Sequence, residues 1–375
     1  MSEKPKYQRV EDIRERFSNL TEKANRATGI KKVTIKENGK VVGVWKSASG
    51  ATVRDAADLI TENKLDDLTR RLTTVYKNAA EDLLMKQESF LHAHEKRVEK
   101  YRAQVEAGTL SEADYQAWMQ GQLFQEQAWA QKRGQLARTM VDVDQQALAM
   151  INDGKIDVFC ENANFIGFRI DQQTGGAAAS FGLYDRNTFT RLVRDQPNLL
   201  PMPEIDEEKD YAWYNKVISD AVTQGILQGE SLDEIVLRVA EDTGEKSLYA
   251  MRRNARTAYT GAQNAGRIEG MRQARDELNI PVKKRWLATL DSHTRDAHAD
   301  LDGKEADIDE PFNSILGPIM YPGDPDAVPA NVYNCRCTLE EVPAGSRWSM
   351  KRRDAETGED VEDMTYKEWV KSKGK

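Results

Sequence analysis

Apolar residues recur at every third or fourth position through much of the first half of the chain, which is the spacing of one face of an α-helix. The pattern is clearest over residues 51–106, a stretch without glycine or proline in which Leu65 and Leu72 belong to the apolar stripe. Gly108 interrupts the stripe, and the helical pattern then continues to about Asn152. We therefore predict two long helices joined by a short turn, as in an antiparallel helical hairpin.

Capping sequences and proline predict where helices begin and end. Thr109-Leu-Ser-Glu112 has the pattern of a capping box, in which Thr109 and Glu112 satisfy free backbone amides at a helix start. Ser231-Leu-Asp-Glu234 repeats this pattern further along the chain. The last long helix is predicted over about residues 246–278, because the residue before Pro281 avoids the helical conformation.

Two segments depart from the helical pattern. β-Branched residues over 33–45 flank Asn38-Gly39, the pair that favours the tight turn of a β-hairpin. Residues 155–171 mix alternating and aromatic positions, so a short strand or an ordered crossover is expected there. A small amount of β-structure is therefore predicted beside the helices.

Prolines separate two kinds of architecture. None occurs between Pro5 and Pro197, whereas six of the 11 lie from Pro311 to Pro343. Because a proline costs about 3 kcal/mol inside a helix, the first stretch permits long helices and the second does not. We predict a mainly α fold of the α+β class, with a compact module rich in Asp, Gly and Pro over about residues 282–343.

Four parts are expected along the chain. They are an N-terminal segment with the β-hairpin (1–54), a helical domain with long antiparallel helices (55–245), a compact α+β module (246–345) and a charged tail (346–375). The tail should pack poorly, except that Tyr366 and Trp369 could anchor a short helix.

Composition excludes some classes of protein. The chain has 375 residues, 31% of them charged, and a formal net charge of −8. No apolar run approaches the roughly 20 residues of a membrane-spanning helix, so no membrane partner is expected. The charged N-terminus lacks the apolar core of a signal peptide. Three cysteines are too few for a disulfide framework and predict a reducing compartment.

The net charge hides two segments of opposite sign. Residues 246–285 contain ten Lys/Arg against three Asp/Glu, a net of +7, and residues 286–340 contain three against eleven, a net of −8. Arginines of the predicted basic helix could neutralise the phosphates of nucleic acid without reading its sequence. The same face could instead pair with the acidic module that follows it. Both interpretations stay open for Arg252, Arg253, Arg256, Arg267, Arg272 and Arg275.

Residue types that bind metals gather in the module. The candidates for three zinc ligands are His298, Cys335 and Cys337, and those for a fourth are Asp291, His293 and Asp302. One residue separates the two cysteines, which is closer than the usual spacing in zinc sites, although side chains two apart share one face of a strand. A structural zinc ion and a metal-free core with a hydrogen-bonded histidine both stay open. Cys160, with no histidine near it in sequence, is expected to be a core residue.

An ordered set of short motifs begins at residue 256. In order they are Arg256-Thr257, Asn264-Ala-Gly-Arg267, Trp286-Leu-Ala-Thr-Leu-Asp291, Thr294-Arg-Asp-Ala-His298, Leu301-Asp-Gly303, Tyr321-Pro-Gly-Asp324 and Asn334-Cys-Arg-Cys337. Over about residues 246–343 this set resembles the phage Mu F-like head morphogenesis domain, found in minor capsid proteins of tailed bacteriophages. Carried over by position, the motif residues are Arg256, Trp286, Asp291, Arg295, His298, Gly303, Cys335 and Cys337.

The resemblance implies a structural role, with no catalytic residue and no required cofactor. Such proteins assemble inside the procapsid near the portal vertex and assist head assembly, DNA packaging or DNA delivery. The partners it implies are the portal protein, the major capsid or scaffolding protein as further options, and packaged double-stranded DNA bound nonspecifically. The implied location is the inside of the virion head, after assembly in the cytoplasm of the infected bacterium. The competing hypothesis is a zinc-dependent hydrolase that acts on nucleic acid or cell wall through His298, Cys335 and Cys337.

Overall fold

The computed structural model describes residues 33–37, 40–45, 55–125, 127–174, 182–228, 238–239, 241–344, 351–354, 360–362 and 365–372. The chain forms two compact units, each built from separate stretches of sequence. Unit 1 draws on residues 1–69, 151–202 and 253–375, and unit 2 on residues 70–150 and 203–252. The four-part division expected from the sequence stays a prediction.

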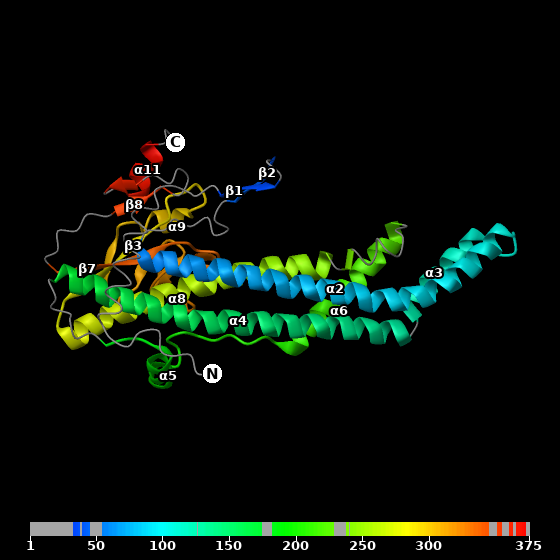
Figure 1. Cartoon of the computed structure of the whole chain (residues 1–375), viewed down its shortest axis with the longest axis horizontal. Helices are drawn as coiled ribbons and strands as arrows, with labels where there is room; N and C mark the ends of the chain where they lie inside the picture. Colours follow the sequence, from blue (N-terminus) through cyan, green and yellow to red (C-terminus); the bar gives the residue numbers. More distant parts are fainter. Residues whose placement is uncertain are drawn as a thin grey trace. The chain divides into compact units, whose positions relative to one another are not determined.

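The elements confirm a mainly α fold with a small β part (Figure 1). The helices are α2 (Ala56–Glu106), α3 (Glu112–Gln125), α4 (Gln127–Gln173), α5 (Arg186–Asp195), α6 (Glu207–Gln228), the short π-helix η1 (Glu241–Glu245), α8 (Lys246–Leu278), α9 (Asp296–Ala299), α10 (Pro329–Val332) and α11 (Tyr366–Ser372). The strands are β1 (Val33–Glu37), β2 (Lys40–Trp45), β3 (Val282–Leu287), β4 (Glu305–Asp307), β5 (Phe312–Ser314), β6 (Gly317–Ile319), β7 (Thr338–Pro343), β8 (Lys351–Arg353) and β9 (Asp360–Glu362).

Helix α2 follows the predicted apolar stripe. It begins beside Asp55, whose carboxylate caps the helix by accepting the backbone N–H of Asp58 at 2.8 Å. Leu65 and Leu72 are buried, as the spacing predicts. The helix ends where Gly108 takes a positive φ of 72°, a conformation that glycine adopts without strain. Both ends of α2 are therefore explained by local sequence.

The start of α3 lies two residues beyond the predicted one. The cap is Ser111, whose hydroxyl accepts the backbone N–H of Asp114 at 3.1 Å and donates to its carboxylate at 2.6 Å. Thr109, the predicted cap, instead donates to the carbonyl oxygen of Gln104 in the last turn of α2, at 2.9 Å. Thr109 thus hydrogen-bonds the C-terminal end of α2, and Ser111 caps the N-terminal end of α3. The second predicted capping box, at residues 231–234, lies outside the described residues.

Helix α4 continues about twenty residues beyond the predicted end near residue 152 and includes residues 155–171. The expected strand or crossover there is therefore wrong. Residues 158–168 are all buried, so apolar residues face every side of the helix and no 3.6-residue period is visible. Cys160 lies in this segment as a core residue, as predicted, and burial raises the pKa of its thiol to about 12.

In unit 1, α4 packs between α2 and α8. Hydrogen bonds join Asn162 to Thr61 at 3.0 Å and Asp157 to Lys64 at 3.2 Å, so the two helices run antiparallel here. On the other side, α8 approaches α4 through glycine: a Cβ added at Gly270 would lie 2.6 Å from a backbone oxygen of α4 and 2.8 Å from a side-chain carbon. Glycine is therefore required for this close contact.

The module after α8 is built on a three-stranded antiparallel sheet with strand order β4-β3-β7. Strands β3 and β7 pair from Val282 opposite Pro343 to Leu287 opposite Thr338, so the predicted module limits coincide with the ends of the sheet. Residues of α8, β3 and β7 share one hydrophobic core with the buried Trp286 at its centre. The sheet and α8 therefore form one packed layer pair, visible beside each other in Figure 1.

A buried lysine links two loops of the module. Lys284 of β3 has no exposed surface, and its Nζ atom donates to the carbonyl oxygens of Ile308 and Met320 at 3.0 and 2.9 Å. Burial lowers the pKa of this ammonium group to about 8. The residue satisfies two loop carbonyls that would otherwise be buried without a donor.

Two small hairpins lie outside the module in sequence. Strands β1 and β2 pair antiparallel, which confirms the predicted hairpin, although its turn residues lie outside the described residues. In the tail, β8 pairs with β9, and α11 confirms the predicted short helix. The tail also contacts the module, because Asp354 is 3% exposed and forms a β-bridge with Leu290. The expectation that the tail packs poorly is thus wrong at this residue.

Unit 2 contains its own buried polar group. The carboxylate of Asp144 on α4 accepts hydrogen bonds from the hydroxyls of Tyr76 on α2 and Tyr214 on α6, the second at 2.6 Å. The Tyr214 hydroxyl also contacts the Ser247 hydroxyl of α8 at 2.7 Å. Burial raises the pKa of Asp144, whereas the hydrogen bonds from the two tyrosine hydroxyls stabilise the carboxylate and oppose that rise. This group ties α2, α4, α6 and α8 together in unit 2.

Candidate functional site

Three predicted zinc-ligand candidates meet inside unit 1. His298 lies in α9, and Cys335 and Cys337 lie just before β7. Both Sγ atoms are 3.5 Å from the Nδ1 atom of His298, and the three potential ligand atoms all lie within 4.8 Å of one another. The residues are buried, with exposed fractions of 2%, 2% and 4%. We call these three residues the Cys2His cluster.

Helix α8 holds the backbone that carries the two cysteines. The hydroxyl of Thr260 donates to the carbonyl oxygen of Cys335 at 2.9 Å, and the amide of Asn264 donates to that of Cys337 at 3.4 Å. Asn334 has a positive φ of 56°, which lets the chain turn sharply before the first cysteine. Tertiary contacts, rather than local sequence, therefore bring both sulfur atoms to the histidine.

The imidazole of His298 is oriented from its other side. Its Nε2 atom lies 3.0 Å from both the backbone oxygen and the side-chain oxygen of Asn331 on α10. A backbone oxygen can only accept, so Nε2 carries the hydrogen and a neutral ring offers its Nδ1 lone pair to the sulfur atoms. Trp286 packs edge-on to this ring, with centroids 5.2 Å apart. Burial raises the pKa of Cys335, which favours the protonated thiol.

The candidates for a fourth ligand have other partners. Asp291 forms an ion pair with Arg336 and accepts the backbone N–H of His293 at 2.9 Å. Asp302 accepts the backbone N–H of Ala288 at 2.7 Å. The side chain of His293 is exposed. Within the described part of the chain, these residues do not join the Cys2His cluster.

Other motif residues shape the loops around the cluster. Gly303 has a positive φ of 76°, which explains a glycine at this turn. The guanidinium of Arg295 donates to the backbone oxygen of Tyr333, and the ring of Tyr333 lies 5.6 Å from the guanidinium of Arg253. These contacts connect the segment before α9 with the segment after α10.

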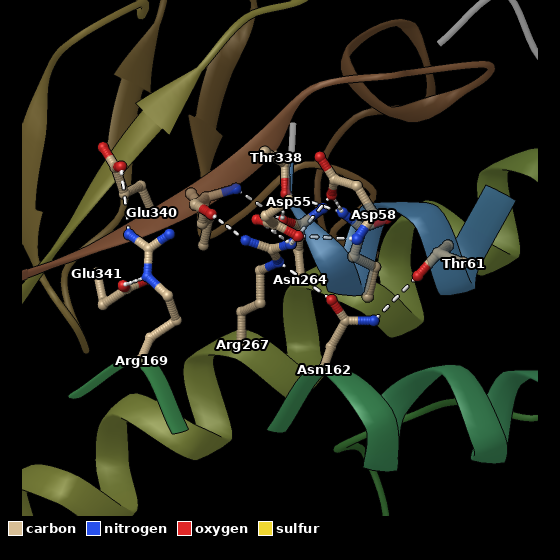
Figure 2. Close-up of polar contacts among 12 residues, drawn as sticks. Asp55, Asp58, Thr61, Asn162, Arg169, Asn264, Arg267, Thr338, Glu340 and Glu341 are labelled. Atoms are coloured by element: carbon tan, nitrogen blue, oxygen red, sulfur yellow. Dashed lines mark hydrogen bonds and ion pairs between the residues drawn. The ribbon is translucent and has the colours of Figure 1, made fainter. Parts of the chain in front are cut away.

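Arg267 was a candidate phosphate contact, and the structure corrects this prediction. The residue is 1% exposed, and its guanidinium donates to both carboxylate oxygens of Asp55 at 2.9 Å and to Asp58 at 3.0 Å (Figure 2). It also donates to the carbonyl oxygen of Leu339 at 3.0 Å and to the side chain of Asn162 at 3.1 Å. Arg267 therefore joins the start of α2 to α4, α8 and β7, and it cannot reach DNA.

Positioning residues of this network were missed by the sequence analysis. Arg169 of α4 pairs with Glu341 of β7 at 2.8 Å and lies 3.8 Å from Glu340 (Figure 2). No sequence pattern predicts such a pair, since its members are 172 residues apart. The role of Asp55 had a local signal, because it stands three residues before Asp58 at the start of an apolar stripe, the position of a helix cap.

Two of the candidate DNA-binding arginines pair with the acidic module. The carboxylate oxygens of Asp309 lie 3.1 Å from a guanidinium nitrogen of Arg272 and 2.5 Å from one of Arg275. This is the geometry that the competing interpretation of the basic helix describes. Because these side chains remain partly exposed, each pair contributes little to stability.

The last two candidate arginines contact α2. In unit 2, Arg252 donates to the hydroxyl of Thr73 at 2.6 Å. In unit 1, Arg256 lies 3.9 Å from the carboxylate of Glu62, and burial lowers the pKa of this guanidinium. Both arginines therefore have intramolecular contacts.

Comparison with known proteins shows what the module is similar to. Residues 216–340 match the family model described as Phage Mu protein F like protein. The chain is 32% identical over 200 residues to Minor head protein GP7 of Bacillus phage SPP1, which covers 53% of this chain and 64% of that protein. It is 38% identical over 156 residues to NAD(+)–arginine ADP-ribosyltransferase EFV of Enterococcus faecalis, which covers 40% of this chain and 30% of that protein.

The chain thus spans less than two thirds of the length of either relative. No solved structure shows a significant match to it. Among the described residues, no helix combines the length and apolar character needed to cross a membrane. The matched segment contains α8, the three-stranded sheet up to Glu340 and the whole Cys2His cluster. Over residues 216–340, the chain is therefore similar to the phage Mu F-like protein family, which confirms the resemblance drawn from its motifs.

Proposed function

We propose that the chain is a minor head protein of a tailed bacteriophage, acting without catalysis inside the head, near the portal, in procapsid assembly, DNA packaging or DNA delivery. The observation that carries this proposal is the 32% identity to Minor head protein GP7 of Bacillus phage SPP1 over 53% of this chain. The match to the Phage Mu protein F like family supports the same role. The corresponding location is the virion head, into which the protein is incorporated during assembly in the bacterial cytoplasm.

The proposed principal partner is the portal protein, with the major capsid or scaffolding protein as further partners. Long helices support this assignment, since α2 has 51 residues and α4 has 47, and helices present extended side-chain surfaces to large partners. Cosedimentation of the purified chain with assembled portal rings tests the contact directly. No comigration at micromolar concentrations would refute the portal as a partner.

A hydrolase is the weaker alternative. Catalytic zinc needs an open coordination position that substrate and water can reach. The members of the Cys2His cluster are 2–4% exposed, which favours a structural role for these side chains.

The ADP-ribosyltransferase name belongs to a protein of which the alignment covers 30%. We expect the purified chain to release no nicotinamide from NAD+ and to modify no arginine substrate.

Deletion of the gene from the viral genome tests the proposed role. Without the protein, we expect a fall in head yield, in DNA content per particle or in infectivity, and we expect recovery when the wild-type gene is supplied in trans. Reconstructions of particles with and without the protein should differ in density next to the portal. Normal values of all three quantities in the deletion strain would refute the proposal.

Nonspecific DNA contact is proposed through the arginines of α8 that retain exposed surface. Binding through phosphates releases counterions, so affinity should fall steeply as salt rises. Replacing Arg272 and Arg275 together by glutamine should reduce the slope of log affinity against log salt by about 2. Unchanged affinity from low to moderate salt would show that these residues serve only their pairs with Asp309.

A further inference from the structure

We infer that the Cys2His cluster binds a zinc ion, which fastens the segment before β7 to α9 inside the Mu F-like module. The ligands are the Nδ1 atom of His298 and the Sγ atoms of Cys335 and Cys337. This inference goes beyond the proposed function, because it concerns the internal chemistry of the module and is independent of any partner. The observations are the spacing of the donor atoms, the orientation of the imidazole and the support of the cysteine backbone.

The sulfur–nitrogen distances of the cluster match those of a tetrahedral zinc site. A tetrahedral zinc ion, with bonds of about 2.3 Å to sulfur and about 2.0 Å to nitrogen, holds those two atoms about 3.5 Å apart. Both sulfur–nitrogen distances in the cluster are 3.5 Å. The three donor atoms lie within 4.8 Å of one another, so small side-chain adjustments suffice for one ion to contact all three.

In a metal-free cluster, the two thiols share a single acceptor atom on the histidine. The Nδ1 atom of a neutral imidazole has one lone pair, whereas two thiols lie at the same distance from it. Only one thiol at a time can donate a well-aligned hydrogen bond to that lone pair. A cation bound by both thiolates and by the lone pair uses all three donors at once.

The surroundings resemble the support that metal ligands need. The Nε2 atom of His298 faces the backbone oxygen of Asn331, which leaves Nδ1 free to bind an ion. Thr260 and Asn264 hold the backbone of the two cysteines from α8. The backbone N–H of Cys337 also points to the sulfur of Cys335 at 3.4 Å, a contact that stabilises a thiolate.

The chemistry of the donors selects the metal. Two thiolates and one imidazole form a soft ligand set, which favours zinc over magnesium or calcium. Three protein donors leave one position of the tetrahedron for a non-protein ligand such as water. Because the cluster is buried, we assign the ion a structural role.

Metal content of the full-length protein tests this inference. Protein produced without a polyhistidine tag in zinc-supplemented medium, and then dialysed against metal-free buffer, should retain about one zinc ion per chain. Cobalt(II) added after removal of zinc should give the absorption bands of a tetrahedral cobalt–thiolate site. Cys337→Ser and His298→Gln should each lower the zinc content at least about tenfold.

Cys160→Ser is the matched control. This cysteine is also buried, at 6% exposed, but lies in α4 outside the cluster, so its replacement should leave the zinc content unchanged. If the cluster variants do not fold, the zinc content and cobalt spectrum of the wild-type protein decide the question. Wild-type protein with below about 0.1 zinc ion per chain and no cobalt–thiolate bands would refute the site. Zinc retained by a folded Cys337→Ser variant would refute these ligands.

Discussion

Replacing Arg267 by methionine, which keeps an unbranched side chain but removes the charged guanidinium, should destabilise unit 1 strongly. The guanidinium makes five hydrogen bonds, three of them to the carboxylates of Asp55 and Asp58. Asp58 is 5% exposed, so water cannot replace the lost cation. Breaking a buried ion pair from one side costs about 3–5 kcal/mol, and we expect a loss of that size.

Hydrogen exchange measured by mass spectrometry provides a suitable assay, because a chain with two compact units need not unfold in one step. Peptides that cover residues 253–278 should exchange at least about 100-fold faster in the Arg267→Met variant, since each 1.4 kcal/mol corresponds to about a factor of ten. Arg272→Met, on the same helix, is the control. Its pair with Asp309 is partly exposed, so its effect should stay below about 1 kcal/mol.

A triple variant separates the lost cation from lost packing. If unpaired carboxylates cause the destabilisation, adding Asp55→Asn and Asp58→Asn to Arg267→Met should restore most of the protection. Exchange as fast in the triple variant as in the single one would refute this reasoning. So would an Arg267→Met effect below about tenfold.

The pH dependence should change as well. Burial alone would raise the pKa of Asp55, but the charge of Arg267, the backbone N–H of Asp58, the charge of Arg169 and the hydrogen bond from Arg267 together outweigh it and hold this pKa below its ordinary value. In the wild type, the resulting stability is present above the pKa of the unfolded chain and is lost only as pH falls through the lower folded value. Without the arginine, the folded pKa rises above the unfolded one, so the variant should gain stability as pH falls from about 7 to about 5.

Three further substitutions test other parts of the fold. Burial lowers the pKa of Lys284 to about 8, from 10.5, so the unfolded chain binds more protons than the folded chain between these pH values. The wild type should therefore gain about 1 kcal/mol of unfolding free energy per pH unit relative to Lys284→Met, as measured by urea titration. Gly270→Ala should lower the free energy of unfolding by about 1–3 kcal/mol in the same assay, because the new Cβ would meet backbone atoms. Gly134→Ala should be neutral or stabilising, because its Cβ would meet only a movable tyrosine hydroxyl. Ser111→Ala should weaken exchange protection at the start of α3 by about 1 kcal/mol, and a larger effect of Thr109→Ala would contradict the observed cap.

The sequence alone determined the elements that depend on local chemistry. Helix α2 follows an apolar stripe and ends next to a glycine with positive φ, and α8 ends before a proline. The proline-rich module begins with β3 and ends with β7, the first and last strands of its sheet along the chain. The family resemblance also rested on short ordered motifs, and the family match confirmed it. Each of these signals lies within a few neighbouring residues, so no knowledge of packing was needed.

Only the tertiary structure decided what depends on burial and on distant partners. Residues 155–171 form helix, which the sequence pattern did not predict. A segment buried on all sides shows no helical period in its sequence. Arg267 looks like any other arginine of a basic helix, and its role depends on two aspartates more than 200 residues away in the chain. The sequence offered His298, Cys335 and Cys337 as candidates, but contacts from α8 and α10 bring their donor atoms together. Such roles arise from contacts across the folded chain, which the order of residues does not display.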